Sequence, residues 1–214
     1  MCKRRVFCLF FSFIIPVVTY ATAQEPDYII YNGEKYSLFV NPLEAYFSIN
    51  PDKRPRSNVR STSLWRGYVA TFEIINKELY LKDIKVEIST GDIRRTEWKS
   101  VLPEFLDGKQ NLKIDWFSGL LVIPHGKLID YVHMGYGSTY ENYILLEIKN
   151  GNFIRENKMH YVEYVQYREK QYQVFKKTQE YLNILKELGE EIPDERLDYF
   201  IKIYESDYTT IILE

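Results

Sequence analysis

Residues 119–151, GLLVIPHGKLIDYVHMGYGSTYENYILLEIKNG, combine strongly apolar runs with turn residues, and most of the predicted fold follows from them. The first apolar run ends at Pro124, which has no N–H to donate to a β-ladder, and the next two residues have the composition of a turn. We therefore predict a tight corner over Pro124–Gly126 between two strands. The glycines near Tyr136 predict a second break in the chain. Short strands separated by such breaks favour an antiparallel sheet.

Pairs of β-prone runs elsewhere in the chain are separated by residues that favour hairpin turns. Asn32-Gly33 and Asn150-Gly151 tolerate the positive φ that both turn positions require. The runs around Asn76-Lys77 alternate apolar and polar residues, which indicates one buried and one exposed face. This alternation slips by one position near Asp83, so we expect a β-bulge there. The sequence therefore predicts a sheet built from hairpins.

After Asn157 the spacing of the apolar residues changes from that of a strand to that of a helix. Apolar positions three, four or seven residues apart continue from Tyr161 to Leu188, as on one face of an amphipathic helix. We predict one long helix over this range, docked on the sheet, with a coiled-coil partner as the alternative. A second, shorter helix is expected to begin at Asp194, with Leu197 on its apolar face.

The first 23 residues have the pattern of a cleaved signal peptide. Basic residues near the start precede an apolar run that is shorter than the ~20 residues of a membrane-spanning helix, and Pro16 interrupts it. The small residues 21–23 (ATA) match a cleavage site. We therefore expect residues 1–23 to be a signal peptide and residues 24–214 to form a single globular domain. The domain would be exported to the periplasm or the extracellular space, with no membrane span after cleavage.

Composition limits the classes of function. Both cysteines, Cys2 and Cys8, lie in the predicted signal peptide, so the exported domain has neither disulfides nor thiol chemistry. The chain carries 28 Lys and Arg against 30 Asp and Glu, and an acidic balance argues against a nucleic-acid partner. It is tyrosine-rich, with 19 Tyr and 12 Phe. This composition favours an aromatic-packed β domain, with a surface that binds protein or glycan as the alternative.

A basic segment lies between Ile49 and Ser63, where Lys53, Arg54, Arg56 and Arg60 alternate with prolines. Prolines and serines in this number predict an exposed loop. A solvated loop is the favoured interpretation of the charges, and an anion site is the alternative.

The residues with the best chemistry for catalysis follow the break near Tyr136. His133 and Glu141 are an acid–base pair by type, and Ser138 is a nucleophile by type. Their spacing does not match a nucleophile elbow, so no catalytic residue is assigned and these three stay candidates. His125, His133 and His160 lack the spacing of a metal-binding pair on a helix, so we expect neither a metal nor another cofactor.

Aromatic and basic residues near two strands are the predicted binding residues. Trp65, Arg66 and Tyr68 form one group, since Trp, Tyr and Arg contribute most binding energy at interfaces. The other group is His133, Tyr136 and Tyr140.

The sequence predicts a single-domain α+β fold, in which a mostly antiparallel sheet is covered by the long helix and the shorter one. The predicted function is an exported, non-enzymatic binding protein of the bacterial cell envelope, such as an inhibitor or immunity-type partner of another protein. Two alternatives stay open, an envelope hydrolase acting on glycan or peptide and a structural or oligomeric envelope module. A protein partner is expected, a glycan is the alternative ligand, and the sequence makes no prediction of oligomeric state.

Overall fold

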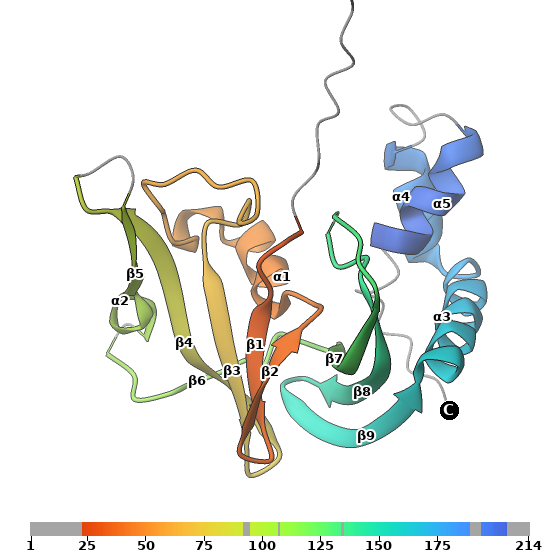
Figure 1. The fold of residues 1–214 in the computed structure, drawn as a ribbon, viewed down its shortest axis with the longest axis horizontal. Coiled ribbons are helices and arrows are strands. Elements are labelled where there is room, and N and C mark those ends of the chain that lie inside the picture. Colours follow the sequence, from red (N-terminus) through yellow and green to blue (C-terminus); the bar gives the residue numbers. More distant parts are fainter. Residues whose placement is uncertain (1–22, 92–94, 107, 134, 189–193, 205–214) are drawn as a thin grey trace, which may run out of the picture.

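The computed structural model describes residues 23–91, 95–106, 108–133, 135–188 and 194–204 (Figure 1). Apart from Ala23, the predicted signal peptide lies outside the described residues. The described chain is α+β, as expected from the sequence. Its strands are β1 (Asp27–Tyr31), β2 (Glu34–Leu38), β3 (Val69–Ile75), β4 (Glu78–Ser89), β5 (Thr96–Ser100), β6 (Leu112–Lys113), β7 (Gly119–Asp130), β8 (Thr139–Lys149) and β9 (Asn152–His160). Its helices are α1 (Pro42–Ile49), the short 3-10 helix η1 (Pro51–Lys53), α2 (Leu102–Leu106), α3 (Tyr161–Phe175), α4 (Gln179–Leu188) and α5 (Asp194–Tyr204).

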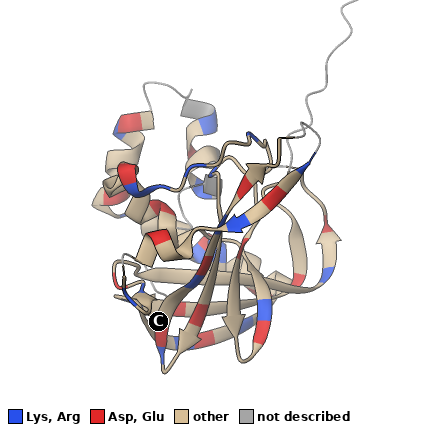
Figure 2. Ribbon diagram, turned by 90° about the vertical axis from the view of Figure 1, so that its left-hand side faces the viewer, with Lys and Arg blue, Asp and Glu red and all other residues tan. Residues whose placement is uncertain are grey.

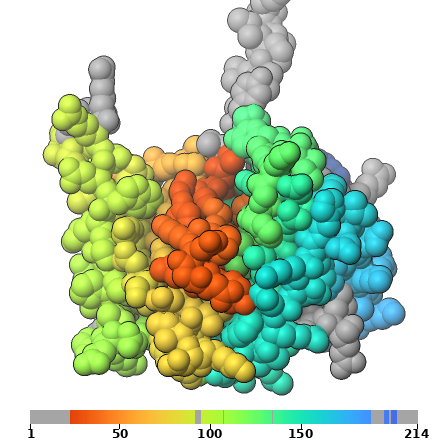
Figure 3. Space-filling model, turned by 60° about the horizontal axis from the view of Figure 1, so that its bottom comes forward, coloured from red at the N-terminus to blue at the C-terminus, as the bar shows by residue number. Residues whose placement is uncertain are grey.

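The strands form one mixed sheet in the order β2-β1-β3-β4-β9-β8-β7, and β5 and β6 both pair with β4. Among the described strands the pairing is antiparallel except between β1 and β3. The sheet is strongly curled, because the N–H of Phe39, just after β2, donates to the carbonyl of Val122 in β7 at 2.8 Å. In Figure 3 the residues near the N-terminus, in red and orange, lie between the yellow β3–β4 part and the green to cyan β7–α3 part. The two ends of the strand order thus approach each other.

The predicted hairpin turns are confirmed. Asn32 and Gly33 have φ of 52° and 83°, and Asn150 and Gly151 have φ of 48° and 70°. Asn76-Lys77 forms the same kind of turn, with φ of 51° and 64°. Gly151 is required for a second reason, because a Cβ there would lie 2.7 Å from the carbonyl oxygen of Ile114. The register shift between Thr71 and Phe72, opposite Asp83, confirms the predicted β-bulge.

Apolar side chains from both parts of the curled sheet form the main core. Ile29, Phe72, Leu79, Leu121 and Leu146 are completely buried in it. Strand β8 is buried on both faces over residues 143–148, since one face lines the core and α3 packs against β8 from the other side. The core therefore fixes the position of β8 and, through it, that of α3.

The predicted corner at Pro124–Gly126 is wrong. Strand β7 continues through Pro124 as far as Asp130, and its pairing with β8 is only shifted between His125 and Leu128. Because β7 is the last strand in the sheet order, it tolerates a missing N–H on one side. Gly126, with φ of 83°, contributes to a bulge instead of a turn.

The prediction of one long C-terminal helix is also wrong. The segment is divided into α3 and α4, because Lys176–Thr178 form a turn in which the N–H of Thr178 donates to Phe175. The Thr178 hydroxyl then accepts from the N–H of Tyr181 at 3.2 Å, as a cap does at a helix start. The predicted second helix is confirmed as α5. A second apolar cluster joins α3, α4 and α5, formed by Tyr172, Phe175, Tyr181, Leu197 and Ile201.

Candidate functional site

Three of the predicted binding residues meet inside the protein. The Arg66 side chain is fully buried and forms an ion pair with Asp27 at 3.2 Å. It also donates to the carbonyl of Glu25 at 2.8 Å and to the hydroxyl of Tyr136 at 3.1 Å. Tyr68, two residues after Arg66 in the chain, is completely buried as well. We name the set Asp27, Asn41, Glu44, Arg66, Tyr68 and Tyr136 the buried network.

Most of the polar atoms of the buried network have partners. Asp27 accepts from the backbone N–H of Ala70 at 2.8 Å and from the side-chain amide of Asn41 at 3.0 Å. Burial raises the pKa of the Asp27 carboxyl, while Arg66 and the hydrogen bonds oppose that rise. Burial likewise raises the pKa of Tyr136 to about 12. The network joins β1, α1 and the segments around residues 66 and 136, which is a structural role.

The network continues towards the surface through Glu44. The Tyr68 hydroxyl donates to Glu44 at 2.7 Å, and burial raises the Tyr68 pKa well above its ordinary value. Arg54 donates to both carboxylate oxygens of Glu44, at 2.9 and 2.8 Å. Such a two-point contact fixes the orientation of both groups. The basic loop after α1 is therefore attached to the buried network.

The three candidate catalytic residues each have separate partners. The exposed His133 ring lies edge-on to Tyr131, with ring centres 4.6 Å apart. The Ser138 hydroxyl accepts from the N–H of Val132 at 3.1 Å and donates to its carbonyl at 3.3 Å. The Glu141 carboxylate accepts from the N–H of Lys127 at 3.3 Å. These contacts close the β7–β8 hairpin, and they are not the mutual hydrogen bonds of a catalytic set.

The other two predicted binding residues lie nearer the surface. Trp65 is 64% exposed, in a turn where Gly67 N–H donates to Leu64. Tyr140 is half-buried and packs edge-on against Phe39, with ring centres 5.7 Å apart. Trp65 therefore keeps the exposed surface that a binding residue needs, whereas Tyr140 contributes mainly to packing.

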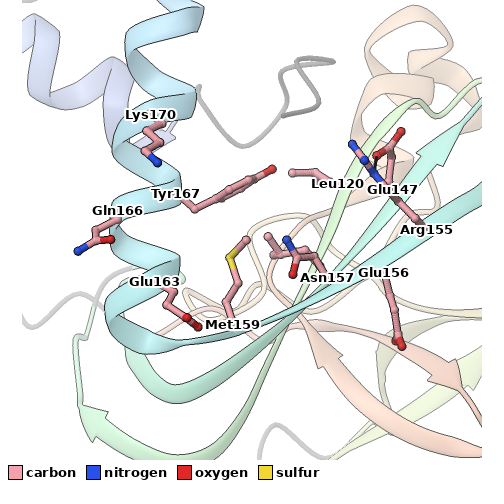
Figure 4. Close-up of a pocket in the computed structure, with 11 residues that line it drawn as sticks. Leu120, Glu147, Arg155, Glu156, Asn157, Met159, Glu163, Gln166, Tyr167 and Lys170 are labelled. Carbon is pink, nitrogen blue, oxygen red and sulfur yellow. Dashed lines mark hydrogen bonds and ion pairs between the residues drawn. The ribbon is translucent and has the colours of Figure 1, made fainter. Parts of the chain in front are cut away.

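A groove of about 520 Å³ lies between α3 and the strands β7, β8 and β9. Figure 4 shows Tyr167 reaching from α3 across it towards Leu120, with Met159 on the strand side. We name this feature the α3 groove. The residues that line it include Leu120, Leu145, Glu147, Arg155, Met159 and Tyr167.

The strands supply the floor of the α3 groove because residues 120, 145 and 147 project from the same face of the sheet. Leu120 and Leu145 are only 8% and 2% exposed, so the floor is apolar. Glu147 lies directly opposite Arg155 in the β8–β9 register, and the two form an ion pair at 2.6 Å. The floor thus combines an apolar surface with a paired carboxylate and guanidinium.

The helix side of the groove is held in place by aromatic and capping contacts. The rings of Tyr143 and Tyr164 stack with centres 3.8 Å apart, joining β8 to α3. The Glu163 carboxylate accepts from the N–H of His160 at 2.9 Å and so caps the start of α3. These contacts make the groove a preformed feature of the fold.

Tyr167 is the residue of α3 that closes one side of the groove. Its hydroxyl accepts from the side-chain amide of Gln171 at 3.0 Å. Burial, with a smaller effect of Glu147, raises the Tyr167 pKa to about 12. The phenol is therefore neutral near pH 7, where it serves as a hydrogen-bonding group and not as a base.

The α3 groove was not predicted from the sequence. Glu147 and Arg155 flank the Asn150-Gly151 turn, and ideal hairpin pairing would place Glu147 opposite Ile154. A register shift between Glu147 and Ile148 places it opposite Arg155. The opposite charges of Glu147 and Arg155 were the one sequence feature that could have indicated the groove. Pairing them correctly requires knowledge of this β-bulge.

Comparisons with protein families, curated proteins and solved structures found no match. Within the described ranges, no three His, Cys, Asp or Glu side chains are grouped as a metal site would require. Of the helices that the structure describes, none combines the length and the apolar character needed to cross a bilayer.

Proposed function

We propose that this chain is an exported, non-enzymatic binding protein of the bacterial cell envelope, and that it binds a segment of a partner protein in the α3 groove. The observation that supports the proposal is the preformed groove with an apolar floor and one ion pair. Binding sites commonly combine apolar walls with a few polar groups that fix orientation. Export itself rests on the predicted signal peptide.

The groove suits an apolar side chain carried on a peptide backbone. Met159 and Tyr167 are only partly buried and offer apolar contact above the nearly buried Leu120 and Leu145. Covering the two partly buried side chains gains about 25 cal/mol for each Å² of apolar surface removed from water. Glu147 and Arg155 provide an acceptor and donors for the backbone of such a segment. Apolar anchors in a pocket with a polar surround are typical of protein interfaces.

One exposed apolar residue of α3 extends this surface. Val162 is 55% exposed and lies one helical turn before Gln166, which lines the groove. A partner that covers both the groove and this part of the helix would bury more apolar area than the groove alone. This favours a protein segment as ligand over a small sugar.

The test compares two substitutions on the same strand. Met159→Glu places a charge in the groove, whereas Ile154→Glu places the same charge at a position that is 50% exposed and outside it. We expect protein captured from envelope extract by the wild type to be lost with Met159→Glu and retained with Ile154→Glu. Circular dichroism of both variants checks that the fold is intact. The proposal fails if the wild type retains no protein at micromolar concentration, or if both variants retain it equally.

The oligomeric alternative is tested separately. A coiled-coil partner, the alternative to a helix docked on the sheet, would pair with one long helix, and the division into α3 and α4 interrupts the apolar stripe that such pairing requires. We expect light scattering to report the mass of a monomer. A dimer that persists on dilution to nanomolar concentration would favour the oligomeric module instead.

A further inference from the structure

A second cavity, of about 480 Å³, lies on another part of the surface. It is enclosed by α1, η1 and the loop after it on one side, and by α2 and the chain around β6 on the other. None of its lining residues belongs to the α3 groove. We name it the basic pocket.

Three aromatic side chains form one wall of the basic pocket. The rings of Tyr46 and Trp116 have centres 4.6 Å apart, and those of Tyr46 and Phe105 are 5.9 Å apart. The three rings come from α1, α2 and the segment after β6, and all three line the cavity. Flat aromatic faces bind planar rings and the apolar faces of sugars. This wall is therefore a surface for the ring of a ligand.

Basic residues surround the opening. Lys53, Arg56 and Lys109 line it together with two carboxylates, those of Asp52 and Glu104. None of the three basic residues forms an ion pair with a carboxylate of the described residues, whereas Glu104 pairs with Lys99 at 3.6 Å. The fourth basic residue, Arg54, is already neutralised by Glu44 at 2.8 Å. In Figure 2, with Lys and Arg in blue, basic positions follow one another along the loop after η1. The chain as a whole has a net charge of −2, so this local excess of positive charge is not a consequence of overall composition.

The loop that carries these charges is fixed to the sheet. The Ser57 hydroxyl donates to the carbonyl of Glu87 at 2.5 Å, and the N–H of Ser89 donates to the side chain of Asn58 at 2.9 Å. On the other side of the basic residues, the contacts between Arg54 and Glu44 attach the loop to α1. A ligand would therefore bind without ordering the loop first, which reduces the entropy cost of binding.

We propose that the basic pocket binds a small organic anion that contains a ring. Its phosphate or carboxylate group would contact Lys53, Arg56 and Lys109, and its ring would pack against Tyr46 and Trp116. The volume is within the usual range for small-molecule sites, about 300–1,000 Å³. This site is independent of the protein-binding groove proposed above.

Titration calorimetry of the full exported chain with three probes tests the proposal. Phenyl phosphate has both the anion and the ring, inorganic phosphate has only the anion, and phenyl β-glucoside has only the ring. We expect phenyl phosphate to bind at one site, and each of the other two probes to bind at least about tenfold more weakly, a difference of about 1.4 kcal/mol. Equal binding of inorganic phosphate would overturn the role of the aromatic wall. Two results would overturn the proposed anion site. One is glucoside binding as tight as that of phenyl phosphate. The other is no saturation by phenyl phosphate below about 10 mM, which corresponds to a binding free energy weaker than about −3 kcal/mol.

A charge-matched pair of double variants locates the binding. Lys53→Ala with Arg56→Ala removes two charges from the pocket, whereas Arg60→Ala with Lys127→Ala removes two charges outside it. We expect the first variant to weaken phenyl phosphate binding about tenfold or more, and the second to change it less than about twofold. Equal weakening by the two would show that only net charge matters and would overturn the proposal.

The tryptophans provide an internal check on the position of the ligand. The chain has three, and Trp65 and Trp98 are 64% and 49% exposed and lie outside the pocket. We expect phenyl phosphate to shift the indole N–H resonance of Trp116, assigned with Trp116→Phe, and to leave the other two unchanged. A shift confined to Trp65 or Trp98 would contradict the assignment of the site.

Discussion

The buried network and the α3 groove each contain an arginine–carboxylate pair, yet the two pairs have different roles. Asp27 and Arg66 are 3.2 Å apart and both side chains are 0% exposed. Glu147 and Arg155 are 2.6 Å apart, with side chains 11% and 53% exposed. The first pair is enclosed by Ala70, Asn41 and Tyr136, whereas the second faces a groove. Both pairs consist of an arginine and a carboxylate. Burial of the side chains, and not residue type, therefore separates the structural ion pair from the ion pair that a ligand can reach.

The physical reason is the cost of removing charge from water. A buried charge must be paired and hydrogen-bonded, because its unpaired form is strongly destabilising. A partly exposed pair keeps water contacts and contributes about 0–1 kcal/mol. Replacing one member of each pair should therefore destabilise the protein far more at the buried pair than at the exposed one.

Arg66→Met should have the largest effect. It leaves the Asp27 carboxylate buried without its cation, which costs about 3–5 kcal/mol in the free energy of unfolding. Burial raises the pKa of Asp27 and Arg66 opposes that rise, so removing Arg66 raises the pKa of Asp27 further in the folded variant. The stability of the variant should therefore be greatest at low pH and fall as pH rises through the folded pKa.

Urea unfolding of Arg66→Met and the wild type at pH 5 and pH 8 measures this effect. The control is Arg66→Met combined with Asp27→Asn, which has no titrating group at position 27. The difference in the free energy of unfolding between the double variant and the wild type should depend less on pH than the difference between the single variant and the wild type. If the free energy of unfolding of Arg66→Met lies within about 1 kcal/mol of the wild-type value at pH 8, the Asp27–Arg66 pair does not have the proposed structural role.

Tyr136→Phe should have an intermediate effect on stability. It removes a hydroxyl that accepts from Arg66 at 3.1 Å and donates to Asn41 at 3.2 Å, at a cost of about 1–3 kcal/mol. Burial raises the Tyr136 pKa from 10.0 to about 12. The contribution of the hydroxyl is therefore fully present below pH 10 and lost as pH rises through about 12. Unfolding curves of the two proteins should converge over that range, and a constant gap would contradict the prediction.

Glu147→Gln should have a small effect on stability and a larger one on binding. The Arg155 side chain is 53% exposed and keeps its contact with water when Glu147 is replaced, so the free energy of unfolding should change by less than about 1 kcal/mol. The variant also keeps the shape of the groove and loses its negative charge. Thermal unfolding and capture of the partner protein measure the two effects. A stability loss comparable to that of Arg66→Met would remove the distinction between the two pairs.

His133→Ala and Glu141→Gln should have the smallest effects. Both are substitutions near the hairpin surface, where changes of about 0.5 kcal/mol or less are usual. They also test the hydrolase alternative, since that hypothesis assigns these side chains the role of acid or base. We expect the wild type and both variants to give the same background rate on glycan and peptide substrates. A wild-type rate that either substitution abolishes would establish the hydrolase.

Local chemistry made part of the fold predictable. The hairpin turns at Asn32-Gly33 and Asn150-Gly151 require positive φ, which few residues adopt, so they were found correctly. The bulge opposite Asp83 was found from a slip in alternation. The helix over 161–188 was predicted as continuous, since periodicity does not show that Thr178 begins a new helix. Pro124 was interpreted as a corner because its place in the last strand of the sheet order is not a local property.

The sequence by itself determined the three hairpin turns, the α+β composition of the chain and the residue types available for binding. Only the tertiary structure decided that Arg66 and Tyr136 lie inside with Asp27, although they are far apart in the chain. It also decided that Glu147 faces a groove under α3 and that Lys53 and Lys109 border one pocket. Turns depend on the backbone preferences of two or three adjacent residues. Burial and the convergence of distant side chains depend on how the sheet curls, which no local pattern specifies.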